Sequence, residues 1–129
     1  MNTQSLAGNA SELKGRTGIR RIFQAAGYSW AGLKAAFFGE AAFRQLLLLS
    51  VVLIPVALCL DVSRVERAML VLVCLLSLIV ELINSAIEAT IDRISLELHP
   101  LSKQAKDLGS AAQFVAMSII AVTWALILL

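Results

Sequence analysis

Three long stretches of the chain are apolar and almost free of charge. They run from 43 to 62, from 68 to 92 and from 110 to 129. Because a helix needs about 20 apolar residues to cross the hydrocarbon core of a bilayer, each stretch predicts a transmembrane helix. The second stretch differs from the other two because its later half carries several polar and acidic residues.

A different pattern precedes the first stretch. Over residues 16–38, large apolar side chains recur every three or four positions, while basic side chains occupy other positions of the helical wheel. This pattern predicts an amphipathic helix that lies in the membrane surface; alternatively, the helix packs on another protein. Residues 1–14 are small and polar and predict a flexible tail. The expected fold is therefore a single all-α integral membrane domain over residues 1–129, with one surface helix and three transmembrane helices.

Composition supports a membrane location. Hydrophobic residues make up 59% of the 129 residues, charged residues 16%, and the mean hydropathy is +0.83. A soluble domain has about 45–50% apolar and about 25% charged residues. A chain this short cannot bury so much apolar surface in its own core, so lipid must cover the rest. The net charge of +2 gives no reason to expect nucleic-acid binding.

The distribution of basic residues predicts the orientation. Six lysines and arginines precede or open the first apolar stretch, and Arg93, Lys103 and Lys106 follow the second. Between these two stretches, Arg64 and Arg67 are balanced by acidic neighbours. The positive-inside rule therefore places the N-terminus and the segment after the second helix in the cytoplasm.

The second apolar stretch carries a polar stripe. At about 100° per residue, its polar residues fall within a sector of roughly 80°; they are Ser77, Glu81, Asn84, Ser85, Glu88 and Asp92. A carboxylate in hydrocarbon costs about 2.5–3.5 kcal/mol on insertion scales, so Glu81 is a candidate functional residue. The alternative is a structural seam in which the stripe joins helices to one another.

Depth in the membrane separates the acidic residues. A helix that starts near Ala68 reaches the cytoplasmic boundary near Glu88, and Glu81 then lies roughly 10 Å deeper. This arrangement suits a reaction between a lipid acceptor and a water-soluble donor. Glu40 lies at the same interface, and two carboxylates are what Mg²⁺ usually takes from a protein when phosphates and water complete its ligands. Alternatively, Glu40 pairs with Arg44, which the spacing by itself favours.

Residues 95–110 form the predicted cytoplasmic loop. It is the only polar segment there long enough to contact a nucleotide, although a charged loop is often merely solvated. Lys103, Lys106, Asp107 and Gly109 are its candidate phosphate or ribose contacts, whereas His99, before Pro100, is expected to be a loop residue. The sequence has neither a P-loop nor the motifs of protein kinases, so phosphoryl transfer would belong to another class.

Several strings resemble one family. AAGYSWAGL at 25–33, EAAFRQ at 40–45, VELINSAIEATIDR at 80–93 and AKDLGSAA at 105–112 are similar to the prokaryotic diacylglycerol kinases. The resemblance covers about residues 19–129. It implies a homotrimer in the bacterial inner membrane whose active sites are shared between protomers. It also implies transfer of the γ-phosphate of MgATP to diacylglycerol, which forms phosphatidic acid for phospholipid recycling.

The resemblance also implies roles for residues. Glu81 would be the general base, with Asn84 beside it, and Glu40 and Glu88 would bind the metal. The implied nucleotide contacts are Arg21, Tyr28, Glu40, Glu88, Glu97, Leu98, His99, Lys106 and Asp107. The implied lipid contacts are Arg21, Ala25, Ala26, Gly27, Tyr28, Ser29, Trp30, Lys34, Ala35, Ala36, Phe37, Ala42, Phe43, Arg44, Gln45, Leu46, Glu81 and Ser110.

Three positions depart from the family pattern. Gln24 and Ala31 stand where members have lysines, and Leu46 stands where members have an acidic residue. We expect Arg20, Arg21 or Lys34 to supply the missing phosphate contacts. A related branch phosphorylates undecaprenol, although GYSW and EAAFRQ favour diacylglycerol. Two other classes remain as alternatives: a small proton-coupled exporter built around one membrane carboxylate, and a non-catalytic membrane subunit.

Overall fold

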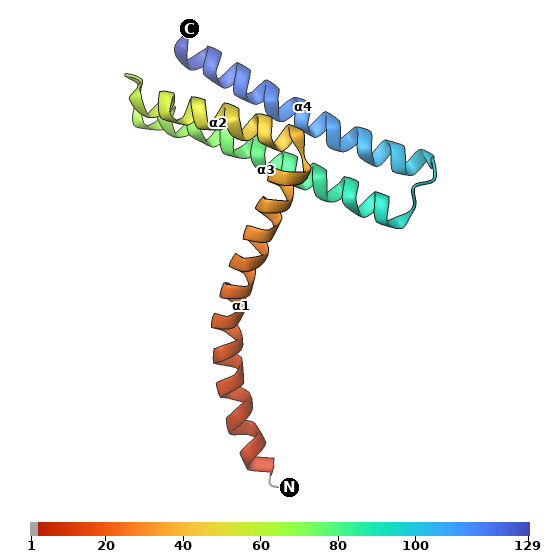
Figure 1. Cartoon of the computed structure of the whole chain (residues 1–129). Helices are drawn as coiled ribbons and strands as arrows, with labels where there is room; N and C mark the ends of the chain where they lie inside the picture. The colour runs from red at the N-terminus through yellow and green to blue at the C-terminus, as the bar shows by residue number, and fades with distance from the viewer. Residues whose placement is uncertain (1–2) are drawn as a thin grey trace. The chain divides into compact units, whose positions relative to one another are not determined.

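The computed structural model describes residues 3–129, with side chains from Thr17 onward. This part of the chain consists of four helices and contains no strand (Figure 1). They are α1 (Thr3–Gly39), α2 (Ala41–Cys59), α3 (Arg64–Ile94) and α4 (Pro100–Leu128). The predicted all-α fold is confirmed. Contacts divide the chain into two units, residues 1–35 and residues 36–129, which are described separately.

The first unit is a single helical segment. Every described side chain in it, from Thr17 to Ala35, is exposed within the chain, including the large apolar side chains of Ile22, Phe23 and Trp30. These apolar groups need a cover that the unit does not supply, since such large exposed patches mark membrane or protein contacts. Residues 3–14 of the predicted tail belong to α1, which therefore begins well before the predicted start of the surface helix at residue 16. Residues 1–2 and the side chains before Thr17 lie outside the described part of the chain.

In the second unit, α3 is the central helix. It packs against α2 on one side and α4 on the other (Figure 1). Its fully buried side chains are Leu70, Cys74 and Ser77. The Ser77 hydroxyl donates a hydrogen bond of 2.7 Å to the Cys74 carbonyl oxygen of the same helix. The polar stripe of α3 therefore begins inside the packed interior of this unit.

The turn between α2 and α3 is tied by one arginine. Arg67 Nη2 donates to the carbonyl oxygen of Leu60 at 2.9 Å, just beyond the last residue of α2. Ser63 caps α3 by accepting a hydrogen bond from the Glu66 backbone N–H at 3.1 Å. The S-x-x-E spacing that starts α3 is a capping signature in the sequence. It explains why α3 begins at Arg64, four residues before the predicted start.

Helices α2, α3 and α4 are long and apolar enough to span a membrane. Many large apolar side chains on them are exposed, among them Leu48, Leu72, Ile79, Phe114 and Leu126. Contact of these apolar side chains with water would be unfavourable, and lipid covers them instead. The 19 residues of α2 extend about 29 Å, and the 31 residues of α3 extend about 46 Å. Because α2 and α3 share the turn at 60–63, the excess length of α3 projects beyond the start of α2.

The connection between α3 and α4 is shorter than the sequence predicted. Only residues 95–99 lie outside helices, and α4 already begins at Pro100, so the predicted loop over 95–110 is wrong. The reason is local: Pro100 occupies the first turn, where its missing N–H costs nothing, and His99 Nδ1 accepts from the Leu101 N–H at 3.1 Å. The candidate nucleotide residues Lys106 and Asp107 consequently lie on a helix.

Candidate active site

The polar stripe of α3 changes from buried to exposed along the helix. Glu81 is 4% exposed, Asn84, Ser85 and Glu88 are half-buried, and Asp92 is exposed. Thus the stripe leads from the interior of the second unit to the projecting end of α3. A carboxylate at one end of such a path meets the membrane interior, while the other end meets water. This is the arrangement needed to join a lipid substrate to a soluble one.

Two further carboxylates, those of Glu40 and Glu88, lie in the same region as Glu81. The charge of each acts on Glu81, so each lies within electrostatic reach of it. Glu40 occupies the break between α1 and α2, and its backbone there is extended, with φ −123° and ψ 110°. This break brings its side chain into the region of Glu81. Its side chain makes no capping hydrogen bond to α2 and is half-buried. The fold thereby keeps this carboxylate available for a ligand.

Arg44 does not neutralise Glu40. Its Nη1 instead donates to the carbonyl oxygen of Phe37 at 2.7 Å, at the end of α1. No ion pair joins Glu40 to Arg44 in the described part of the chain, so the pairing that the spacing favoured is wrong. The physical reason is the helix break, because an i,i+4 pair requires continuous helix and Glu40 has left helical geometry.

Asn84 is held in close contact with α4. A Cβ atom added at Gly109 would collide with the Asn84 Oδ1 atom and would lie 3.2 Å from Asn84 Cγ. Gly109 is itself buried. Only glycine permits this approach of the two helices. Gly109, a candidate phosphate contact by its place in the sequence, lies instead against the α3 stripe.

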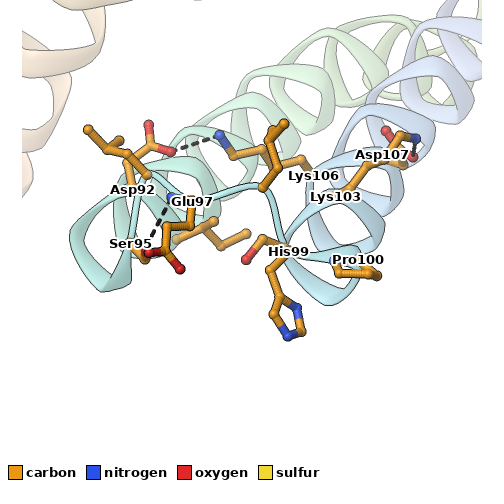
Figure 2. A pocket seen from close by; sticks show the side chains of 12 residues that line it. Asp92, Ser95, Glu97, His99, Pro100, Lys103, Lys106 and Asp107 are labelled. Carbon is orange, nitrogen blue, oxygen red and sulfur yellow. Dashed lines mark hydrogen bonds and ion pairs between the residues drawn. The ribbon is translucent and has the colours of Figure 1, made fainter.

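The projecting ends of α3 and α4 enclose a groove of about 910 Å³ (Figure 2). An ion pair of 2.7 Å from Lys106 Nζ to Asp92 Oδ1 joins the two helices beside it. Lys103 pairs with Asp107 at 2.6 Å along α4. The groove brings together five of the predicted nucleotide contacts. These are Glu97, Leu98, His99, Lys106 and Asp107, and the other lining residues are Ile91, Asp92, Ser95, Leu96, Pro100, Ser102 and Lys103.

The groove combines cations with an open edge. In Figure 2 the Lys106 side chain reaches across to Asp92, whereas the His99 imidazole points away from the connection. Ser95 Oγ accepts from the Glu97 backbone N–H at 3.0 Å and shapes the turn. The lining carries charges of both signs, because the two lysines are each paired with a carboxylate, Lys106 with Asp92 and Lys103 with Asp107. An ammonium group is a point-charge partner for phosphate, so a lysine that leaves its carboxylate partner could bind a phosphate group here.

The predicted lipid contacts fall into two groups. Those from Ala25 to Ala35 are exposed in the first unit. In the second unit Phe37, Ala42, Arg44, Gln45 and Ser110 are exposed, whereas Ala36, Phe43 and Leu46 are buried by the chain itself. The buried three contribute to packing between helices. Arg21 and Tyr28, predicted to contact both substrates, belong to the first unit and are exposed.

Gln113 of α4 has no role predicted from the sequence. Both polar atoms of its amide are buried without a hydrogen-bond partner, as are Asn84 Oδ1 and Ser85 Oγ. The sequence did mark Gln113, because it is the one carboxamide in the uncharged stretch from 110 to 129. The sequence does not show which helix packs against that stretch, so it offered no reason to connect Gln113 to the α3 stripe.

The site therefore consists of one buried carboxylate, two half-buried carboxylates near it and a groove lined by lysines and carboxylates, on helices long and apolar enough to span a membrane. Comparison with known proteins identifies the family. Residues 27–128 match the family model for prokaryotic diacylglycerol kinase. The diacylglycerol kinase of Pseudomonas aeruginosa is 72% identical over 119 residues, which cover 92% of this chain and 97% of the relative. The diacylglycerol kinase of Escherichia coli K12 is 48% identical over 112 residues, covering 87% and 92% of the two chains. The chain belongs to the prokaryotic diacylglycerol kinase family.

Proposed function

We propose that this chain, a membrane kinase that acts on diacylglycerol, uses Glu81 as the general base of phosphoryl transfer. The observation that carries the proposal is the position of Glu81: a carboxylate that is 4% exposed, at the inner part of a stripe that leads to the groove between α3 and α4. Membership of the prokaryotic diacylglycerol kinase family supports diacylglycerol as the acceptor and ATP as the donor. The position of Glu81 along α3 supports a depth in the membrane that suits a lipid hydroxyl.

In the proposed reaction, the free hydroxyl oxygen of diacylglycerol attacks the γ-phosphorus of ATP. The bond from that phosphorus to the β,γ-bridging oxygen breaks, ADP leaves, and the hydroxyl proton passes to the Glu81 carboxylate. The products are phosphatidic acid and ADP. Asn84, on the same face one turn along α3, orients the acceptor or Glu81. Positioning and charge stabilisation supply most of the rate in phosphoryl transfer.

We propose Mg²⁺ as the metal and Glu40 and Glu88 as the residues that hold it. The donor chemistry fits in type, because Glu40 and Glu88 are half-buried carboxylates near Glu81. Among the described residues no group of three or more His, Cys, Asp or Glu could hold a metal by itself, so the nucleotide and water would have to supply the other ligands. Mg²⁺ typically takes one or two carboxylates and completes its shell with waters and phosphate oxygens. When bound, it would neutralise charge on the phosphates.

For the nucleotide, we propose the groove between α3 and α4. Lys106 and the residues of the 95–99 connection would contact the polyphosphate and ribose, and Arg21 and Tyr28 would join them. The proposed lipid contacts are those predicted from the sequence between Ala25 and Leu46, together with Ser110. Since Ala36, Phe43 and Leu46 are buried, we assign to them the packing that shapes this lipid site.

The proposed assembly is a homotrimer in the bacterial inner membrane. The exposed apolar side chains of the first unit support a surface helix covered by lipid and by neighbouring protomers. The transmembrane segments would be 43–62, 68–92 and 110–129, with 16–38 on the cytoplasmic surface and 1–14 as a tail. The lysines and arginines before the first transmembrane segment and after the second support a cytoplasmic active site.

Transfer of radiolabelled γ-phosphate from MgATP, in mixed micelles that contain diacylglycerol or undecaprenol, tests this proposal. We expect label in phosphatidic acid, and a loss of kcat of about 10²–10⁴-fold in Glu81→Gln. Near-normal turnover in Glu81→Gln would refute the general-base role. Label only in the product from undecaprenol would show that the acceptor is undecaprenol, as in the related branch. Absence of label from a folded protein would contradict kinase activity and direct attention to proton-coupled transport.

A further inference from the structure

Four buried polar atoms on α3 and α4 lack a hydrogen-bond partner. They are Asn84 Oδ1, Ser85 Oγ, and both Gln113 Oε1 and Gln113 Nε2. All four are buried by the chain itself. Buried polar atoms are almost always satisfied, and an exception calls for an explanation such as a bound water, an ion or a functional rearrangement.

The placement of Gln113 follows from Gly109. Gly109 touches Asn84, and Gln113 lies four residues further along α4, on the same face and one helical turn deeper. Ala116, the next residue on this face, is also buried, and α3 is the helix against which α4 packs extensively. Gln113 therefore faces α3 near the level of Glu81 and Asn84.

Side-chain direction brings the two amides toward one another. Helical side chains lean toward the N-terminus of their own helix. The joined ends of α3 and α4 make the two helices antiparallel, so the Gln113 side chain leans toward Gly109 while the Asn84 side chain leans inward. Since Gly109 has no side chain, nothing from that position separates them.

We propose that Gln113 is a positioning residue, whose amide holds the Asn84 side chain through one buried water. The water would donate to Asn84 Oδ1 and Gln113 Oε1, and it would accept from Ser85 Oγ. A buried water typically makes two to four such bonds. This inference rests on the proposed role of Asn84 in the active site and assigns the residue that keeps Asn84 in place.

Gln113→Met tests the proposal because methionine keeps the length of the side chain and removes its polar atoms. Gln104→Met is the matched control, since Gln104 is an exposed residue of the same helix that lies outside the groove lining. We expect Gln113→Met to lower kcat about fivefold to tenfold, with KM values for MgATP and diacylglycerol within about twofold of wild type. Gln104→Met should leave all three constants unchanged. If Gln113→Met folds poorly, Gln113→Asn, which withdraws the amide by one methylene, should give the same kcat loss.

Two further readouts separate positioning from a structural role. In a double-mutant cycle, Gln113→Met should add little to the loss caused by Asn84→Ala, because both act on one group. Independently of activity, the side-chain amide resonances of Asn84 in solid-state NMR spectra should shift in Gln113→Met and remain in place in Gln104→Met. Fully additive losses, or Asn84 resonances that do not move, would overturn the inference. Wild-type turnover in Asn84→Ala itself would instead refute the proposed role of Asn84, and the inference with it.

Discussion

Gly109 of α4 lies directly against the side chain of Asn84 on α3, so closely that a single methyl group added to the glycine would overlap Asn84 Oδ1. This contact sets the separation of the two helices beside the buried carboxylate Glu81. It also joins the membrane part of the site to the groove, because Lys106 lies one turn before Gly109 and pairs with Asp92. The geometry of the site therefore depends on a residue without a side chain.

Gly109→Ala should destabilise the protein and lower its activity. Overpacking costs about 1–3 kcal/mol, and here the added methyl group would displace the Asn84 amide from its position in the stripe. In an Asn84→Ala background the obstacle is gone, so Gly109→Ala should become neutral or stabilising, because alanine exceeds glycine in helix propensity by about 1 kcal/mol. Thermal unfolding in detergent measures both effects.

Gly32→Ala is the control for this experiment, since nothing lies within 4 Å of a Cβ atom built there. It should leave the activity unchanged and should not lower the unfolding temperature, because alanine is the better helix former. A destabilisation by Gly109→Ala that is equally large with and without Asn84 would contradict the contact as the cause.

Glu40→Gln and Glu88→Gln should each raise the Mg²⁺ concentration needed for half-maximal activity by about tenfold or more. Each change removes one proposed oxygen ligand while keeping the shape of the side chain. Titration of activity with Mg²⁺ at fixed ATP measures the shift. Glu66→Gln, at the opposite end of α3, should titrate like wild type, and a similar shift in that control would point to bulk charge as the cause.

Lys106→Met should raise the KM for MgATP about tenfold or more with kcat less affected, because the ammonium group is lost from the groove mouth. The stability should change little, since the Lys106 and Asp92 side chains are 42% and 50% exposed and such pairs contribute little. Arg93→Met removes one positive charge from the same end of α3 without touching the groove. An equal rise in KM in Arg93→Met would show that general charge, rather than contact, attracts the nucleotide.

Shared active sites predict complementation between inactive variants. If Glu81 of one protomer works with Arg21 of its neighbour, mixed trimers of Glu81→Gln and Arg21→Ala should regain about one quarter of wild-type sites at equal mixing. Activity after the two purified variants are unfolded, mixed and refolded together measures this recovery. Recovery should be absent when the variants are refolded apart, and no recovery in the mixture would place both residues in one protomer's site.

The pattern of apolar residues was sufficient to predict the helices of the membrane part. Long uncharged stretches have few alternatives to a spanning helix, because every backbone polar group must be satisfied within lipid. The stripe from Ser77 to Asp92 was also readable, since helical spacing alone places these residues on one face. The start of α4 was missed because Lys103 to Gly109 have the polarity of a loop, whereas the His99 cap and Pro100 begin a helix there.

Thus the sequence by itself determined the family, the helical membrane fold and the candidate base Glu81, because these depend on composition, period and local strings. Only the tertiary structure decided that Arg44 turns to the Phe37 carbonyl rather than to Glu40, that Gly109 abuts Asn84, and that Gln113 has buried atoms without partners. These relationships arise where helices distant in the sequence meet or where a helix breaks. Residue spacing within one helix carries no information about which side chain a neighbouring helix brings opposite to it.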